Sequence, residues 1–504
     1  MLIKNQFKIN SMKKIYTTIV LLFGSIIYSQ DGTLDATFGI EGIMNITNIC
    51  KIKCAKIQPD GKIVGAGYIY NDSGNQACIF RLNSDFTFDT TFDTDGKLIF
   101  NYFGQFDNVL SIYVYPNGKI LAGLDYGKLL RLNQDGTYDS TFGINGFVNN
   151  SGYYIAIQKD GKIISTAVYT NGYFKVFRHD IDGTLDLTFN GIGSNNILIN
   201  ATSCRVKDIA IQNNGQIIII GYGPTLPSIP NMAAIRINTN GTIDNTFSLP
   251  IVAGIKVPEK IYLNNNSTFI LGLNYNSPRN VALIKYDSSN ALDNTFDNDG
   301  YSLISYGDPI NEVNRPSMLN FQPDGKIIMT EKRAYTLNSN VYYDGIISRQ
   351  NTDGSLDTTF GTNGYSSLYL WSSEYEPCLS LISPIDGKLI VLGTYLTYEA
   401  SPGTGLSKTI RIAKYNTGID ASQLNNENHL FNSFNLSPNP TNSILSIETQ
   451  EKITSISLIN ILGKKTNISN FENNKIDVSA LQNGVYFIEI ATEKGLQTQK
   501  FIKN

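Results

Sequence analysis

Short runs of alternating apolar and polar residues recur along most of the chain, with turn-forming dipeptides between them. Alternation with a period of two is typical of β-strands that are buried on one face. The turn phrase QPDGKI, which begins at Gln58, lies between two such runs. Asp-Gly in this position is a strong hairpin signal, because both residues tolerate the positive φ of a tight turn. The pattern predicts an all-β protein of short antiparallel strands.

The strand pattern repeats with the same phrases in the same order. Seven phrases related to DGTLDATFG begin at Asp31, Asp85, Asp135, Asp182, Asn240, Ser289 and Asp353. Seven phrases related to QPDGKI begin at Gln58, Tyr115, Gln158, Gln212, Leu263, Gln322 and Pro384, the one at Leu263 being degraded. A third phrase, such as FRLN at 80–83, ends each unit. Four antiparallel strands in about fifty residues are typical of one propeller blade.

The phase of the repeat at its two ends predicts a closed ring. The first DGTLD phrase, at Asp31, has no preceding strand, and the last strand, which ends at Asn416, has no following DGTLD phrase. Bringing these ends together would complete the seventh unit and cover the sheet edges that an open array would expose. We therefore expect residues 31–416 to form a seven-bladed β-propeller of four-stranded repeats.

The phrases DGTLDxTFGxxG, QPDGKI and RLN, in this order, resemble the delta-60 repeat family of bacterial surface and secreted proteins. The resemblance covers about 31–416. It implies a propeller-like array and brings no catalytic mechanism with it.

A different pattern follows the repeats. Residues 417–433 are polar and predict a linker, and residues 434–504 hold about seven short alternating strands, which predict a small β-sandwich. This last segment resembles the type IX secretion sorting domain of type A, through Pro438, Asn439, Pro440, Gly463, Gly484, Tyr486 and Lys500. The resemblance implies a Gram-negative cell, contact with a translocon and a sortase, and a product that is attached to the cell surface or released. From the residues themselves, we expect the prolines to enforce an extended first strand and the glycines to occupy turns.

The first 29 residues predict a Sec signal peptide. A basic start at Met12-Lys13-Lys14 precedes an apolar stretch at 15–28, and cleavage is expected between Ser29 and Gln30. Met12 is a better start than Met1, because it places Lys13 and Lys14 at the extreme N-terminus. The apolar stretch is shorter than the ~20 residues that span a bilayer, and no later segment reaches that length, so no transmembrane helix is expected.

Composition narrows the range of partners and chemistry. The formal net charge is only -3 and no basic stripe is present, which argues against nucleic acid as a partner. His179 and His429 are the two histidines of the chain, and the five cysteines match no zinc pattern; buried free thiols are the better interpretation.

The acidic residues of the repeats have two interpretations. Aspartates in the DGTLD phrases could serve acid-base chemistry, but a residue that recurs in every unit is better explained as part of a turn. These are Asp35, Asp89, Asp139, Asp186, Asp244, Asp293 and Asp357. The DTDG and DNDG phrases offer a weak structural calcium site at Asp93, Asp95, Asp297 and Asp299, although a plain turn is favoured because the acidic twelfth residue of a calcium loop is missing.

The connections at one end of the predicted strands vary in length and carry aromatic residues. The longest lie at 223–232, 332–345 and 397–408. Their face is the candidate ligand surface, with Tyr102, Tyr335, Tyr342, Tyr343, Trp371, Tyr375 and Tyr398 as candidate contacts and Phe103 beside them. We expect a secreted or surface protein without catalytic activity that binds a glycan or protein ligand, and no cofactor. A polysaccharide-active or other hydrolytic enzyme and a structural surface component remain the alternatives.

Overall fold

The structure is a computed structural model of the whole chain. It describes residues 30–47, 49–71, 74–102, 107–149, 151–169, 173–198, 205–225, 229–274, 280–304, 315–337, 340–368, 379–397, 407–419, 434–449, 453–460, 465–468, 471, 474–492 and 495–504. The predicted signal peptide, with Ser29, and most of the predicted linker lie outside these residues. The described part contains no helix with the length and apolar character needed to cross a bilayer.

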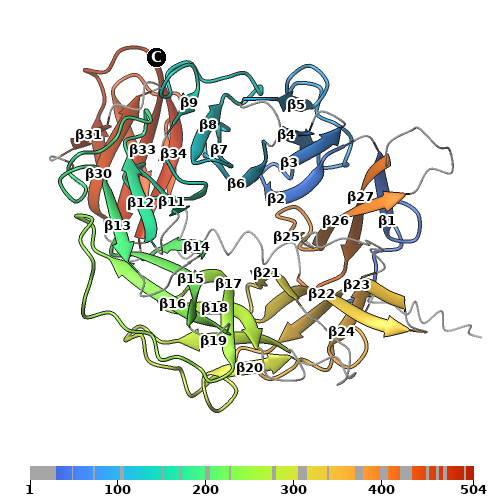
Figure 1. Cartoon of the computed structure of the whole chain (residues 1–504). Helices are drawn as coiled ribbons and strands as arrows, with labels where there is room; N and C mark the ends of the chain where they lie inside the picture. The colour runs from blue at the N-terminus through green and yellow to red at the C-terminus, as the bar shows by residue number, and fades with distance from the viewer. Residues whose placement is uncertain are drawn as a thin grey trace, which may run out of the picture.

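Seven antiparallel sheets, numbered here as blades 1 to 7, follow one another around a ring (Figure 1). Blade 1 contains β2 (Lys51–Ile57), β3 (Ile63–Asn71), β4 (Gly74–Leu82) and β5 (Lys97–Phe100). Blade 2 contains β6 (Val109–Val114), β7 (Ile120–Leu124), β8 (Lys128–Leu132) and β9 (Phe147–Val148). Blade 3 contains β10 (Tyr154–Ile157), β11 (Ile163–Tyr169), β12 (Tyr173–His179) and β13 (Ser194–Leu198).

The remaining blades repeat this order from the inner to the outer strand. Blade 4 contains β14 (Arg205–Ile211), β15 (Ile217–Thr225) and β16 (Ile229–Ile237). Blade 5 contains β17 (Ile255–Asn264), β18 (Ser267–Asn274), β19 (Asn280–Tyr286) and β20 (Tyr301–Ile304). Blade 6 contains β21 (Arg315–Phe321), β22 (Ile327–Leu337), β23 (Asn340–Gln350) and β24 (Tyr365–Leu368). Blade 7 contains β25 (Leu379–Ile382), β26 (Leu389–Thr397), β27 (Ser407–Tyr415) and β1 (Ile43–Thr47).

The ring is closed by the N-terminal strand, as the repeat phase predicts. Strand β1 pairs antiparallel with β27, in register from Ile43 opposite Ala413 to Thr47 opposite Thr409. Before that strand, the amide of Gly32 donates to the carbonyl oxygen of Asn416 at 2.6 Å. The outer strand of blade 7 therefore comes from the start of the repeats and its other three strands from the end. In every other four-stranded blade the outer strand follows the DGTLD phrase, so each blade is shifted by one strand relative to the sequence unit.

Blade 4 departs from the expected four strands. Among the described residues it has three, and the segment after its DGTLD-like phrase, SLPIVAG at 248–254, forms no ladder with β16. Pro250 has no amide hydrogen to donate in that segment. Leu249 and Val252 are buried instead between blades 4 and 5, and the carbonyl oxygen of Pro250 accepts a hydrogen bond from the Tyr286 hydroxyl at 2.9 Å. Packing thus replaces strand pairing at this outer edge.

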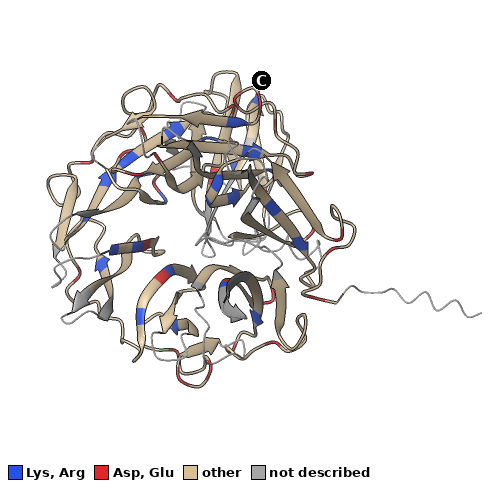
Figure 2. Cartoon of the chain, turned by 45° about the vertical axis from the view of Figure 1, so that its right-hand side comes forward, with Lys and Arg blue, Asp and Glu red and all other residues tan. Residues whose placement is uncertain are grey.

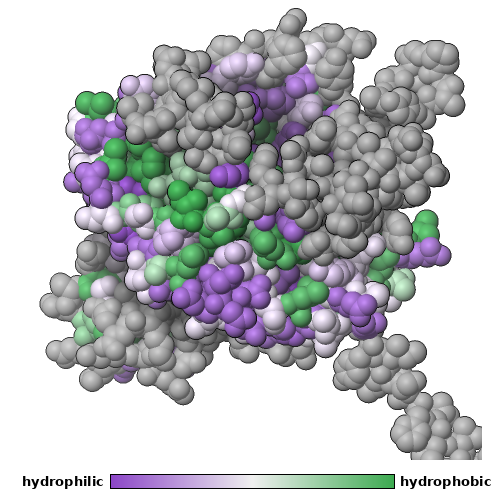
Figure 3. All heavy atoms as spheres, turned by 60° about the horizontal axis from the view of Figure 1, so that its bottom comes forward, coloured by the Kyte–Doolittle hydropathy of each residue, from purple (hydrophilic) through white to green (hydrophobic). Residues whose placement is uncertain are grey.

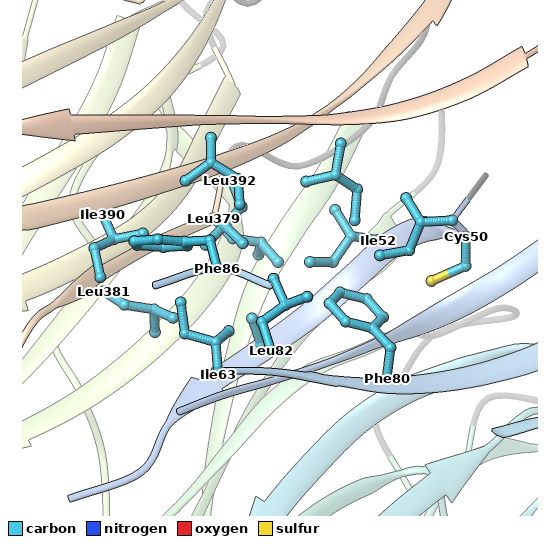
Figure 4. Close-up of a cluster of buried hydrophobic side chains, with 14 of the residues drawn as sticks. Cys50, Ile52, Ile63, Phe80, Leu82, Phe86, Leu379, Leu381, Ile390 and Leu392 are labelled. Carbon is cyan, nitrogen blue, oxygen red and sulfur yellow. The ribbon is translucent and has the colours of Figure 1, made fainter. Parts of the chain in front are cut away.

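The core consists of apolar layers between adjacent blades. Because side chains alternate along a strand, each blade offers one apolar face to each neighbour. Figure 4 shows the layer between blades 7 and 1, where Leu379, Ile390 and Leu392 meet Ile52 and Phe80. Similar buried clusters lie between the other six pairs of neighbours. Cys50 and Cys78 belong to the first of these layers, and their thiols, like that of Cys54, are free.

Antiparallel pairing separates the ring into two faces. The DGK turns and the DGTLD phrases connect strands at one end, which we call the link face. The connections from β3 to β4 and from β5 to β6, with their equivalents in the other blades, lie at the opposite end, which we call the variable face. The inner strands run from the variable face to the link face, and each contacts the inner strand of the next blade around the full circle.

His179 introduces a titratable group into the core of blade 3. It pairs with Ile163 at the position that Leu82 occupies in blade 1, and it is 2% exposed. Among the described residues its Nδ1 has no hydrogen-bond partner. Burial disfavours the charged imidazolium and lowers the pKa of His179 to about 4.

This burial predicts a loss of stability in mild acid. Between about pH 6.5 and pH 4 the unfolded chain binds a proton at His179 that the folded chain does not, so stability falls as the pH falls. The His179→Leu variant should lose less, by up to about 3 kcal/mol at pH 4. Denaturant unfolding at pH 7, 5.5 and 4 measures the difference, with His429→Gln as the control. Equal pH dependence of His179→Leu and the unmodified chain would contradict the prediction.

The tail forms two small sheets with a core of their own. One contains β28 (Asn435–Ser437), β29 (Ile444–Glu448) and β32 (Lys475–Asp477). The other contains β31 (Lys465–Ile468), β30 (Ile453–Asn460), β33 (Gly484–Thr492) and β34 (Gly495–Lys503). Leu445, Ile476, Ile488 and Phe501 are buried in one apolar cluster that both sheets supply, which confirms a small β-sandwich.

Candidate functional site

A buried network of charges explains most of the repeated residues. In blade 3 the Asp186 Oδ2 atom accepts hydrogen bonds from Arg178 Nε at 2.6 Å and from Lys162 Nζ at 2.8 Å. Its Oδ1 atom accepts from the amide and the hydroxyl of Thr188 at 3.0 and 2.6 Å. The Arg178 guanidinium also lies 4.7 Å from the ring centre of Phe189. The Lys of DGK, the Arg of RLN and the Asp, Thr and Phe of LDxTF thus meet at one point.

The same network recurs with small changes around the ring. Its full form joins Asp89 to Arg81 and Lys62, Asp139 to Arg131 and Lys119, and Asp357 to Arg349 and Lys326. Asp244 is joined to Arg236 and Gln216, Asp293 to Lys285, and Asp35 to Lys388. The interpretation of these aspartates as structural residues of the turns is confirmed by these contacts.

In blades 1, 2, 3 and 6 the network also joins the blade to the next one. The Arg178 Nη1 atom donates to the carbonyl oxygen of Thr239 in the following link, and Arg349 Nη1 donates to that of Thr417 at 2.7 Å. Burial alone would raise the pKa of Asp186, but the hydrogen bonds from Lys162, Thr188 and Arg178 outweigh it and hold that pKa well below its usual range. The repeated carboxylates therefore stay ionised and serve the scaffold.

The proposed calcium residues take part in turns of the link face. Asp93 and Asp297 have positive φ angles of 45° and 50°, and their amides donate to the carbonyl oxygens of Asp135 and Asp353 in the next link. Asp95 Oδ1 accepts from the Lys97 amide at 2.9 Å, and Asp299 Oδ1 from the Tyr301 amide at 3.2 Å. In the described part of the chain, no three His, Cys, Asp or Glu side chains gather closely enough to hold a metal ion.

The predicted aromatic contacts are described only in part. Trp371, Tyr375, Tyr398 and Phe103 lie outside the described residues, as do the side chains of Tyr335, Tyr342 and Tyr343. Tyr102 is 39% exposed; its ring lies 3.7 Å from Lys128 Nζ and 4.3 Å from the Phe147 ring centre. One face of Tyr102 is thus already used within blade 2.

Two of the predicted long loops are extended hairpins instead. Strands β22 and β23 pair as far as Leu337 opposite Asn340, which brings Tyr335 opposite Tyr342 within a ladder. Strands β15 and β16 pair as far as Thr225 opposite Ile229. A paired ladder satisfies the backbone hydrogen bonds that a long loop would leave to water, so the connections at 223–232 and 332–345 were wrongly predicted as loops.

The inner strands carry a second, unrepeated set of charges. Figure 2 shows basic and acidic positions on the strands as well as in the links. The ladder between the two innermost strands shifts register in five blades, between Ile52 and Cys54, Val109 and Ser111, Val206 and Asp208, Pro258 and Lys260, and Pro316 and Met318. A β-bulge bends a strand and re-aims its side chains, and bulges are frequent beside functional sites.

The bulges in blades 4 and 5 bring opposite charges together. Lys207 and Glu259 are the bulged residues, and Lys207 Nζ lies 2.6 Å from Glu259 Oε2. The residues that follow them, Asp208 and Lys260, lie 3.8 Å apart, and Asp208 also accepts the Ile261 amide at 3.2 Å. Two ion pairs therefore join neighbouring inner strands.

These pairs interact with residues from other blades. The charges of Asp208 and Lys260 act on Lys56 in blade 1, and those of Asp208 and Glu259 act on Tyr154 in blade 3. Blades 1 and 5 are not neighbours, so these charges act across the centre of the ring. We call Lys56, Tyr154, Lys207, Asp208, Glu259, Lys260 and Tyr262 the axial cluster.

Burial and neighbouring charges shift the pKa values of several groups in the axial cluster. Burial, followed by the charge of Lys260, lowers the pKa of Lys56, whereas the charge of Asp208 raises the pKa of Lys260. Burial raises the pKa of Tyr154, and it raises that of Tyr262 to about 12. Convergent titratable groups with perturbed pKa values are a physical mark of a functional site.

The axial cluster was not predicted from the sequence. Its members are not repeated, and they lie in the strand just before each DGK phrase, at positions whose direction depends on the bulges. One signal was present: charged residues interrupt the apolar alternation in KIKCAKI at 51–57, RVKDIAI at 205–211 and IKVPEKIYLN at 255–264.

Exposed apolar residues recur in the links of the link face, and Ile181, Leu185, Leu187 and Ile192 belong to a single link, that of blade 3. Ile40 and Ile144, in the links of blades 7 and 2, are 82% and 75% exposed. The described surface in Figure 3 shows apolar residues interspersed with hydrophilic ones. Single exposed apolar residues are common on soluble proteins and indicate no site by themselves.

The sorting-motif residues of the tail lie at different places in the sandwich. Pro438 and Pro440 follow β28 instead of lying within a strand, because proline cannot donate to a ladder. Asn439 Oδ1 accepts the Ile502 amide at 2.9 Å, which joins the PNP motif to the strand that carries Lys500. Tyr486 stacks on Phe501, with ring centres 5.7 Å apart. Gly484 is the first residue of β33, and Gly463 lies outside the described residues.

Comparison with known families gives two matches. Residues 435–504 match the secretion system C-terminal sorting domain, and residues 58–92, 116–142 and 212–247 match a domain of unknown function (DUF5122) beta-propeller. No curated protein matches the chain.

Solved structures give distant matches. A crystal structure of endo-arabinase from Bacteroides thetaiotaomicron is 9% identical, with 52% of this chain and 92% of that chain covered and a TM-score of 0.30. A thermostable family-43 glycoside hydrolase is 11% identical, with 52% and 88% covered and a TM-score of 0.28.

Proposed function

We propose that this chain, a β-propeller with DUF5122 repeats that a C-terminal sorting domain directs to secretion, is a ligand-binding protein without catalytic activity. The sorting domain places the protein outside the cell or on the surface of a Gram-negative bacterium and implies contact with the secretion machinery. The ligand, a glycan or a protein, is bound at the variable face and along the inner strands that begin there.

One observation carries this proposal: the ring contains two sets of charges with different arrangements. The repeated set is enclosed within and between blades, where each aspartate accepts hydrogen bonds from scaffold residues. The axial cluster is unrepeated and gathers side chains from blades 1, 3, 4 and 5. Polar groups that converge from several blades suit recognition of one polar ligand.

The ionisation of the repeated aspartates supports binding over hydrolysis. Their pKa values lie below the range of a general acid at neutral pH, and the axial carboxylates of Asp208 and Glu259 are paired with lysines. The repeated carboxylates thus stay ionised, and the two axial carboxylates form ion pairs with Lys260 and Lys207.

A binding screen with a shortened hairpin tests the proposal. Deletion of residues 334–343 removes the paired ends of β22 and β23 and keeps the rest of their register. We expect the unmodified chain to bind a component of an array of glycans and extracellular proteins saturably. The deletion should weaken that binding at least tenfold, because it removes part of the variable face.

The matched control changes the opposite face. Ile144→Ser alters an exposed residue of the link face and should bind like the unmodified chain. Absence of saturable binding by the folded chain would contradict the proposal. Equal weakening by both variants would contradict the choice of face.

A hydrolytic enzyme is the second candidate, and one carboxyl group favours it. Burial raises the pKa of Asp125, whose carboxylate accepts a hydrogen bond from Asn108 Nδ2 and lies near Asp107. A carboxyl group with a raised pKa can act as a general acid. Release of reducing ends by the unmodified chain, abolished in Asp125→Asn, would establish the enzyme in place of the binding protein.

A further inference from the structure

Lys56 is a cation of the axial cluster without a counter-ion of its own. Its side chain is accessible to solvent, although protein atoms surround it closely enough to lower its pKa, and within the described part of the chain it makes no hydrogen bond or ion pair. The two carboxylates of the cluster are already engaged, Glu259 with Lys207 and Asp208 with Lys260 and the Ile261 amide. Within the axial cluster three lysines therefore accompany two carboxylates, and Lys56 is the lysine that forms no ion pair with either of them.

A hydroxyl donor occupies the same level of the ring as Lys56. In blade 1, Lys56 pairs with Val64, which pairs in turn with the network residue Arg81. In blade 5, Tyr262 pairs with Phe269, which pairs with the equivalent network residue Lys285. The Tyr262 hydroxyl accepts the Leu319 amide at 3.0 Å, and it stays protonated at neutral pH because its pKa is about 12. Among the described residues no acceptor binds this proton, so a ligand can accept it.

The same level offers further groups that suit a sugar. Tyr113 in blade 2 and Asn320 in blade 6 occupy the equivalent rows, opposite Leu121 and Ile328. Asn320 Nδ2 donates to Ser380 Oγ at 2.7 Å, which holds its amide in place. Tyrosine rings and amide groups contact the ring faces and hydroxyls of carbohydrates. The positive charge of Lys56 in addition favours an anionic group on the ligand.

We propose that Lys56, with Lys260 and the Tyr262 hydroxyl, binds the oxyanion group of an acidic extracellular polysaccharide, a carboxylate or a sulfate. This inference rests on the proposed function and names the ligand class of the same site. The oxyanion neutralises the charge of Lys56 and accepts the Tyr262 proton, and both interactions are strengthened by a charged partner.

Calorimetric titration of the full mature chain tests this assignment with four probes: polygalacturonate for the carboxylate, dextran sulfate for the sulfate, neutral dextran and polyglutamate. We expect saturable binding of at least one acidic polysaccharide and a weakening of roughly tenfold to hundredfold in Lys56→Gln. Lys56→Arg keeps the charge and should bind within a few-fold of the unmodified chain. Lys159→Gln removes the same charge from an exposed residue of the link face and should have no effect.

Every outcome bears on the assignment, provided that thermal unfolding shows the variants to be folded. If Lys56→Gln does not fold, Tyr262→Phe replaces it and should weaken binding of the same probe. Binding of neutral dextran that is indifferent to Lys56 would overturn the inference and leave the proposed function standing. If polyglutamate binds equally tightly and in a Lys56-dependent way, the ligand class is not a polysaccharide. If neither acidic polysaccharide binds, the assignment of an oxyanion site is wrong.

Discussion

Asp89→Asn is expected to lower the free energy of unfolding by about 3–5 kcal/mol, the cost of leaving a buried charge without its partner. Asp89 and Arg81 are each only 4% exposed, and Lys62 approaches the same carboxylate oxygen at 2.8 Å. The asparagine has the size of the aspartate but no charge, so two cations would share one neutral amide. Denaturant unfolding at neutral pH, followed by circular dichroism, measures the loss.

Asp293→Asn is the matched control for this prediction. The equivalent network of blade 5 has one lysine, Lys285, and its two side chains are 18% and 17% exposed. Water can replace the lost partner there, so the expected loss is about 1 kcal/mol. Equal losses at the two positions would contradict the view that burial sets the strength of the network.

Deletion of residues 30–47 is expected to abolish cooperative unfolding of the ring. The deletion removes β1, exposes the edge of β27, and removes Asp31, whose carboxylate lies 2.9 Å from Arg349 of blade 6. An open edge strand pairs readily with other chains, so aggregation should accompany the loss. Differential scanning calorimetry and size-exclusion chromatography detect both effects.

A chain that ends at Ile419 controls for truncation itself. It keeps β1 and β27 and loses only the tail, whose apolar core is separate. It should unfold cooperatively and elute as a compact monomer. Cooperative unfolding of the chain without residues 30–47 would contradict the closing role of β1.

The architecture was predictable because the same local chemistry recurs in every unit. Asp-Gly turns set the hairpins, as the φ of 81° at Gly61 illustrates, and the phase of the DGTLD phrase at Asp31 predicted closure against Asn416. The purpose of the repeated Arg, Lys and Thr was not predicted, since it depends on three segments of one blade meeting in space. The three-stranded blade 4 was missed because Pro250 and the packing of Leu249 and Val252 outweigh the repeat.

The candidate site was less predictable than the fold. The sequence predicted ligand contacts in long connections that carry aromatic residues. Among those predicted contact residues, only Tyr102 has a described side chain. Lys56, Asp208 and Lys260 looked like ordinary polar positions of strands. Their convergence follows from ring closure and from bulges, which a single repeat unit does not specify.

Lysine footprinting of the full mature chain, with and without a saturating bound polysaccharide, locates the ligand on the ring. Reductive dimethylation followed by mass spectrometry gives the extent of modification of each lysine with and without the polysaccharide. We expect protection of Lys56, Lys207 and Lys260, whereas Lys159 and Lys62, near the link face, should react equally in both states. Protection confined to lysines of the link face would contradict a ligand site on the inner strands.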